Sequence, residues 1–259
     1  MNILDKIVAH KRTEIATAKN NSLIRELESS VFFQRHTFSL TENLLKEKSS
    51  GIIAEFKRQS PSKGIINDTV SAIEVVKTYE DAGVAGSSVL TDTDFFGGNK
   101  QDLLSVRKEV SIPLLRKDFM IDEYQFLEAK SWGADVVLLI ASILTPKEVK
   151  HFTELAKSLQ LEVLLELHDE TELNHVHHLV DMVGINNRNL KTFEVDIEQS
   201  IRMAEKLGND FVKVAESGIS DIETLKLFKQ NGFHGFLIGE NFMKTANPGL
   251  ACKEFISML

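Results

Sequence analysis

Short apolar segments of the β type recur at nearly equal intervals along the chain from Ile52 onward. Eight can be counted, and the seven intervals between the first and the last average about 26 residues, the length of one strand, one helix and two loops. Continuous runs of Val, Ile and Leu are typical of parallel strands buried on both faces. The segments are IIAEF at 52, GSSVL at 86, IPLLR at 112, DVVLLIA at 135, LEVLLEL at 161, MVGI at 182, FVKVAES at 211 and GFLIG at 235.

Helical patterns fill the gaps between these segments, for example from Ser71, Asp122, Thr145 and Asp221. Alternating strands and helices predict an α/β protein. Eight units in 259 residues fit a closed (β/α)8 TIM barrel, which typically has roughly 250 residues. A doubly wound open sheet is the alternative, but eight near-equal repeats favour closure. We interpret residues 1–259 as one TIM-barrel domain, with an N-terminal helical extension at 1–50 packed on a barrel at 51–259.

Charge and composition narrow the class of function. The net charge is −8 and the chain has no dense Lys/Arg run, which argues against a nucleic-acid surface, so an anionic substrate would need a local site. The longest apolar run, VVLLIA from Val136, is too short to span a membrane. Charges interrupt the first fifteen residues, unlike a signal peptide, and Cys252 is the only cysteine. We expect a cytoplasmic protein.

Polar residues follow several predicted strands at their carboxyl ends, where TIM barrels carry their active sites. Strand side chains alternate between faces, so Glu55 and Lys57 share a face, as do Leu115 with Lys117 and Leu164 with Glu166. Arg116 should face the opposite side. The sequence therefore predicts that charged groups meet at the barrel mouth. The groups expected to converge there are Glu55, Lys57, Lys117 and Glu166, and the other residues at strand ends are Asn186, Arg188, Glu216, Ser217 and Gly239.

Burying one charge costs several kcal/mol unless it is paired, so a bare core would reject these residues. A purely structural layer of ion pairs that plugs the barrel is the alternative to an active site. Two glycine-bearing turns, ESGIS from Glu216 and IGEN from Ile238, follow the last two strands, where barrels often bind phosphate. SPSKG, from Ser60 to Gly64, could close over that group with Ser60 and Lys63 as donors. The alternative is a pair of ordinary tight turns.

Three further patterns resemble a metal site or a reactive group, but the residues around them do not support such a function. DTDFFGG from Asp92 begins like a calcium loop, but Phe96 and Leu103 occupy ligand positions. His175, His177 and His178 lack identifiable partner ligands, and a polar helix face explains them better. Cys252, in the predicted final helix, has no activating base and is interpreted as a packing residue.

The motifs in this order resemble those of indole-3-glycerol phosphate synthases. The matching segments are IIAEFKRQSPSKG, VLTDTDFFGG, PLLRKDF, LLELHDE, GINNRNL, VAESGI and LIGENFM. They span Ile52 to Met243, while the first fifty residues match the family in character more than in sequence. The resemblance implies a carbon–carbon carboxy-lyase of tryptophan biosynthesis. This enzyme converts 1-(2-carboxyphenylamino)-1-deoxyribulose 5-phosphate to indole-3-glycerol phosphate by ring closure, decarboxylation and dehydration.

The resemblance also implies roles for individual residues. Lys117 would be the general acid, and we expect other cations and partial desolvation to lower its pKa. Glu166 and Lys57 would remove the ring proton and assist the departing hydroxyl, with the division between them left open. Glu55 and Glu216 would orient the lysines. Substrate contacts would come from Asn186, Arg188, Phe96, Phe119, Ser60, Ser217, Gly218, Gly239 and Glu240.

The resemblance implies that Gly218, Gly239 and Glu240 hold phosphate through backbone N–H groups, so we expect the Glu240 carboxylate to point away from it. The family uses no cofactor or metal. The expected partner is a small phosphorylated substrate, with no nucleic acid and no membrane. The oligomeric state is left open, a monomer being one option, as is docking with other pathway enzymes.

Other functions fit the same barrel. Lys117 could form a Schiff base, as in barrel aldolases, which borohydride trapping would detect. A phosphoribosyl isomerase fits the fold but leaves the two lysines and two carboxylates at the first, third and fifth strands unexplained. A non-catalytic sugar-phosphate binder would keep only the anion site, and Lys117→Ala would then change nothing measurable.

Overall fold

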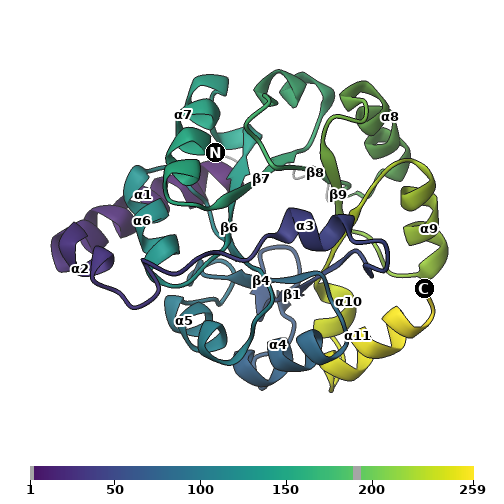
Figure 1. The fold of residues 1–259 in the computed structure, drawn as a ribbon, viewed down its shortest axis with the longest axis horizontal. Coiled ribbons are helices and arrows are strands. Elements are labelled where there is room, and N and C mark those ends of the chain that lie inside the picture. The colour runs from purple at the N-terminus through teal and green to yellow at the C-terminus, as the bar shows by residue number, and fades with distance from the viewer. Residues whose placement is uncertain (1–2, 189–193) are drawn as a thin grey trace.

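Eight parallel strands close into a barrel in a computed structural model that describes residues 3–188 and 194–259 (Figure 1). The strand order is β1-β10-β9-β8-β7-β6-β5-β4, with β4 pairing back to β1. The predicted closed barrel is confirmed, and the open sheet is excluded. The strands are β1 (Ile52–Phe56), β4 (Gly86–Leu90), β5 (Leu114–Lys117), β6 (Val136–Ile140), β7 (Glu162–Leu167), β8 (Met182–Asn186), β9 (Val212–Glu216) and β10 (Gly235–Ile238).

Side chains alternate between the barrel interior and the helical layer, as the period of a strand requires. Ile53 belongs to the apolar cluster inside the barrel, whereas Ile52 and Phe56 belong to the cluster between strands and helices. Within the barrel, Leu115, Leu164 and the other apolar residues lie below the charged ends of the same strands. The interior is therefore a packed floor with a polar layer above it.

Helices surround the barrel, and most begin at a side-chain cap. Asp122, Thr145 and Asp221 each accept a hydrogen bond from a first-turn N–H group, and the helices predicted after them are confirmed. No helix within residues 3–188 and 194–259 combines the length and apolarity needed to cross a membrane. The outer helices are α4 (Ala72–Asp81), α5 (Lys100–Glu109), α6 (Glu123–Ser131), α7 (Pro146–Ser158), α8 (Ile197–Leu207), α9 (Ile222–Gln230), α10 (Glu240–Met243) and α11 (Pro248–Ser257).

The connection after β7 departs from the repeat. It holds a 3-10 helix, η2 (Glu170–His175), where the other units have an α-helix, and η1 (Ala141–Ile143) is a second 3-10 turn. The polar helix face expected for the three histidines is therefore wrong, because His177 and His178 lie beyond η2 in irregular chain. Both ring nitrogens of His175 contact backbone carbonyls, of Glu172 and Leu144, which ties down the end of the turn.

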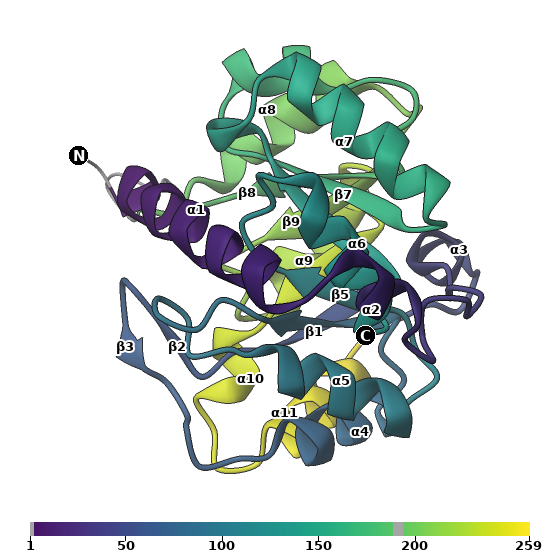
Figure 2. The same ribbon diagram turned by 90° about the vertical axis from the view of Figure 1, so that its left-hand side faces the viewer.

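Residues 3–50 form three helices, α1 (Ile3–Asn21), α2 (Ile24–Glu28) and α3 (Leu40–Leu45). Helix α1 lies on the same side of the barrel as the small hairpin β2 (Gln59–Ser60) and β3 (Gly64–Ile65), and α3 lies at the opposite end (Figure 2). Leu40 and Leu44 of α3 pack with the interior cluster. We propose that these helices and the barrel form one domain.

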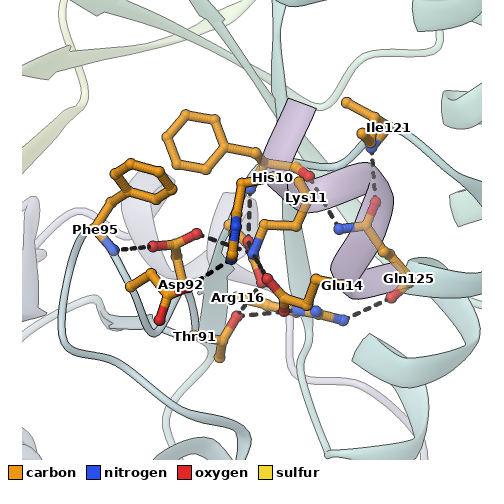
Figure 3. A network of polar contacts seen from close by, with 12 residues as sticks. His10, Lys11, Glu14, Thr91, Asp92, Phe95, Arg116, Ile121 and Gln125 are labelled. Atoms are coloured by element: carbon orange, nitrogen blue, oxygen red, sulfur yellow. Dashed lines mark hydrogen bonds and ion pairs between the residues drawn. The ribbon is translucent and has the colours of Figure 1, made fainter. Parts of the chain in front are cut away.

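A buried lysine fastens α1 to the barrel. Figure 3 shows Lys11 reaching from α1 toward Asp92, beside Thr91 and Arg116. Its ammonium lies 2.9 Å from Asp92 Oδ2 and 3.0 Å from Asp118 Oδ1, and only 1% of the side chain is exposed. Burial alone would lower the pKa of Lys11, but the attraction of the carboxylates raises it above the ordinary value. The cation is therefore a fixed joint between α1 and the ends of β4 and β5.

Candidate active site

One cavity of about 210 Å³ opens at the carboxyl ends of the strands. Lys63, predicted as a phosphate donor, is not among the lining residues, but the fourteen other predicted site residues line the cavity, so the structure brings them together, while their roles stay predictions. They are Glu55, Lys57, Ser60, Phe96, Lys117, Phe119, Glu166, Asn186, Arg188, Glu216, Ser217, Gly218, Gly239 and Glu240. The charged layer thus borders an open space, which a sealed structural plug would not leave.

Lys117, at the end of β5, is the centre of the charged layer. Its Nζ atom donates to Glu216 Oε2 at 2.5 Å and lies 3.3 Å from Glu166 Oε2. Beside this group, Lys57 Nζ donates to Glu55 Oε1 at 2.6 Å. Arg116 points away from the cavity and contacts Asp118, Glu128 and Gln125, as the strand parity predicts. The mouth therefore holds two ammonium groups, each in contact with carboxylates.

The expected lowering of the Lys117 pKa is wrong. Burial does favour the neutral amine, but the negative charges of Glu216, Glu166 and Glu55 outweigh it and raise the pKa of Lys117 well above its ordinary value. The expectation assumed that neighbouring cations dominate, whereas the nearest charges are carboxylates. Beside these carboxylates, the Lys117 side chain remains a protonated ammonium group.

The three carboxylates around the lysines differ in charge state. Burial opposes ionisation of Glu55 and Glu166, but contact with ammonium groups overcomes it and lowers the pKa of each. For Glu216, burial and the nearby charge of Glu166 win over Lys117, and together they raise the pKa of Glu216 to about 7. One carboxyl group of the cluster can therefore change charge near neutral pH.

A glycine makes room for Glu216. A β-carbon at Gly184, on the neighbouring strand β8, would lie 2.2 Å from Glu216 Oε1, far inside contact distance. With any larger residue, either the Glu216 carboxylate or β8 would have to move. Gly184 was not predicted from the sequence, because it carries no chemistry of its own and its neighbour is known only from the strand register.

His168 was also missed among the site residues. Its Nε2 atom lies 3.0 Å from Glu166 Oε1, and the same oxygen accepts a hydrogen bond from Asn186 Nδ2 at 3.0 Å. The sequence did carry a signal for this residue. In LLELHDE, His168 follows Glu166 by two positions and so continues the face that points toward the barrel mouth.

The opposite part of the cavity is apolar. The rings of Phe96 and Phe119 lie with centroids 5.9 Å apart, and Ile3, Leu4 and Ile7 of α1 join them in the lining. An aromatic group fits such a surface. The contribution of α1 was not predicted residue by residue, since the sequence does not show where the extension docks.

Two turns shape the far end of the cavity. Ser217 and Gly218 follow β9 in the left-handed region, with φ of 66° and 72°. Gly239 precedes the short helix α10, and Ser60 enters the lining from the hairpin β2–β3, a strand pair that the sequence did not reveal. These backbone turns suit an anion.

The Glu240 carboxylate lies near two cations. It lies 3.5 Å from Lys63 Nζ and 3.8 Å from Arg188 Nη2. The expectation that this carboxylate turns away from phosphate stays a prediction, as does the role of the GINNRNL motif, whose last two residues lie outside the described ranges. Among residues 3–188 and 194–259, no three His, Cys, Asp or Glu side chains are grouped to hold a metal ion.

The chain is similar to known proteins over nearly its whole length. The family model described as indole-3-glycerol phosphate synthase matches residues 4–255. A protein of that name from Bacteroides thetaiotaomicron is 46% identical over 99% of this chain and 98% of its own length. The protein of that name from Neisseria meningitidis serogroup B is 42% identical over 94% and 95%, and that from Acinetobacter baylyi is 38% identical over 99% and 96%.

Proposed function

This chain belongs to the indole-3-glycerol phosphate synthase family, and we propose that the charged cavity at its barrel mouth is where that synthesis takes place. The enzyme closes the pyrrole ring of 1-(2-carboxyphenylamino)-1-deoxyribulose 5-phosphate with loss of carbon dioxide and water, a step of tryptophan biosynthesis. The observation that carries the proposal is the position of Lys117, between two carboxylates and beside an apolar surface in one cavity.

We propose that Lys117 is the general acid of ring closure. The aromatic carbon that bears the carboxylate attacks the ketone carbon, and the ketone oxygen takes a proton from the Lys117 ammonium. A high pKa does not prevent this transfer, because the oxygen becomes an alkoxide, which is a stronger base than an amine. Carbon dioxide then leaves and restores the aromatic ring. The contacts with Glu216 and Glu166 keep Lys117 charged and aimed until the alkoxide develops.

Dehydration needs an acid for the departing hydroxyl and a base for the ring proton. Glu166 suits the role of base, because Lys117, His168 and Asn186 all favour the ionised form of the Glu166 carboxylate. Lys57 suits the acid, since its ammonium contacts Glu55 and lines the same cavity. We therefore assign proton removal to Glu166 and protonation of the leaving hydroxyl to Lys57, with Glu55 and Glu216 as positioning residues.

The remaining lining residues match the other parts of the substrate. We propose that Phe96 and Phe119 pack against the carboxyphenyl ring and that Arg188 and Asn186 bind its carboxylate and the sugar hydroxyls. The backbone N–H groups of Gly218, Gly239 and Glu240, with the hydroxyls of Ser60 and Ser217, would hold the phosphate. In this arrangement, Lys63 and Arg188 hold the Glu240 carboxylate away from the phosphate.

A Schiff-base reaction at Lys117 is disfavoured by the same geometry. A lysine nucleophile must be neutral, whereas Glu216 and Glu166 stabilise the ammonium form. Incubation of the purified protein with the carboxyphenylamino substrate should produce indole fluorescence, and borohydride should trap no adduct. A chain that binds the substrate without product formation would contradict the proposed function.

A further inference from the structure

Behind Glu166 lies a mostly buried histidine that the roles above do not use. His168 follows β7, and its side chain is only 9% exposed. Its Nε2 atom lies 3.0 Å from Glu166 Oε1, which is the length of a hydrogen bond without its alignment. The attraction between the two groups is therefore chiefly one of charge, and it is greatest when the imidazole is protonated.

The second ring nitrogen of His168 is held by a serine and a glutamate. Ser142 Oγ lies 3.0 Å from His168 Nδ1 and donates its own proton to Glu172 Oε1 at 2.6 Å. Because the hydroxyl has one proton, its oxygen accepts from Nδ1–H. Glu172 Oε2 accepts the backbone N–H of His168 at 2.6 Å, so both the ring and the chain are fixed.

This arrangement determines what Nε2 can do. Since Nδ1 keeps its proton, a second proton on the ring would lie on Nε2 and bring the positive charge to face the Glu166 carboxylate. The acidic residues around the ring are Glu166 on β7, Glu172 on η2, Glu216 on β9 and Asp169 beside it in the chain. Burial alone would lower the pKa of His168, but Glu166, Glu172 and Glu216 together raise it.

The two oxygens of Glu166 are thereby distinguished. Oε1 receives the amide of Asn186 and faces His168, whereas Oε2 lies 3.3 Å from Lys117 Nζ at the cavity. We propose that His168, fixed by Ser142 and Glu172, is a positioning residue that holds Glu166 from behind and keeps it ionised as the base of dehydration. The inference rests on the proposed role of Glu166.

The pH profile of kcat provides the test, with product fluorescence as the assay. In His168→Gln the side chain keeps an amide donor but loses the charge, so the pKa of Glu166 should rise. The acid limb of the profile should then move upward by about one pH unit. The loss should approach about tenfold below that limb and should disappear near pH 8, where Glu166 is ionised in both proteins. Ser142→Ala, at an exposed position, should shift the limb in the same direction by less. His178→Gln is the matched control and should leave the profile unchanged.

A readout independent of turnover completes the test. The imidazole of His168, followed by NMR in the unmodified protein, should titrate above an ordinary histidine, and its pKa should fall in Glu166→Gln. An unmoved acid limb in both His168→Gln and Ser142→Ala would overturn the inference, as would an unchanged His168 titration in Glu166→Gln. If Glu166→Gln itself keeps full kcat, the proposed role of Glu166 fails. A missing shift with an inactive Glu166→Gln refutes only the role of His168.

Discussion

Lys117 Nζ and Glu216 Oε2 lie 2.5 Å apart, although the two residues are separated by 99 positions in the sequence. The contact joins the ends of β5 and β9 across the barrel interior. Only closure of the sheet can bring these strands to one mouth, so the fold itself creates the pair. Because Glu216 is buried, its ionisation costs free energy of folding. The arrangement of the site therefore lowers the stability of the folded protein.

The first prediction concerns this cost. The pKa of Glu216 is raised to about 7 from an ordinary value of 4.5, so the folded protein binds a proton more tightly than the unfolded chain between those values. The contribution of this group to stability is therefore lost as pH rises from 4.5 to 7. Between pH 5 and pH 8, the free energy of unfolding should fall less in Glu216→Gln than in the unmodified protein. The difference between the two decreases should be about 1–3 kcal/mol, and kcat of the variant should be lower.

Urea unfolding at the two pH values measures this difference. Glu223→Gln, an exposed change on α9, is the control and should show the same pH dependence as the unmodified protein. Equal pH dependence in Glu216→Gln and the unmodified protein would show that Glu216 does not titrate in this window.

The second prediction concerns the space beside Glu216. In Gly184→Ala the new methyl group would lie 2.2 Å from Glu216 Oε1, so the carboxylate or β8 must move. We expect a loss of about 1–3 kcal/mol in the free energy of unfolding, together with reduced kcat. Adding Glu216→Asp shortens the side chain and should restore much of the stability without restoring kcat. A Gly184→Ala protein that is as stable and active as the unmodified protein would contradict the close contact between residue 184 and Glu216.

The third prediction concerns the joint between α1 and the barrel. Lys11→Met leaves Asp92 and Asp118 buried without their shared cation, which should cost about 3–5 kcal/mol of folding free energy. Because α1 lines the cavity through Ile3, Leu4 and Ile7, KM should rise severalfold more than kcat falls.

Lys19→Met is the matched control on the same helix. Lys19 is 45% exposed and pairs with Asp122 at 2.7 Å, so its loss should cost less than about 1 kcal/mol and leave KM unchanged. Thermal unfolding and steady-state kinetics of the two variants would show whether the buried lysine matters more. Equal effects would mean that the buried joint is not what holds α1 in place.

Much of this architecture was predictable because it depends on period and parity. The strand repeat predicted closure, and the two-residue alternation correctly placed Lys117 inward and Arg116 outward. Charge states were harder to predict, because they depend on distances between strands. The pKa of Lys117 was predicted in the wrong direction because the nearest charges, Glu216 and Glu166, could not be ranked before their separations were known.

Contacts made by chemically silent residues could not be predicted. Gly184 matters only through the strand register that sets it against Glu216, and Leu4 only through the docking of α1. Strand parity could have predicted that His168 faces the same way as Glu166, but a histidine in a polar loop has many ordinary explanations. The histidines after η2 were assigned to a helix because the repeat was extrapolated through a unit that lacks one.

The central claim is that Lys117 delivers the proton for ring closure, and one assay tests it most directly. Purified protein and its Lys117→Ala variant are compared for indole fluorescence from the carboxyphenylamino substrate, with Lys226→Ala on α9 as an exposed lysine control. We predict that Lys117→Ala lowers kcat by at least about 10²-fold while the control keeps full activity. A Lys117→Ala enzyme with undiminished kcat would contradict the proposed mechanism.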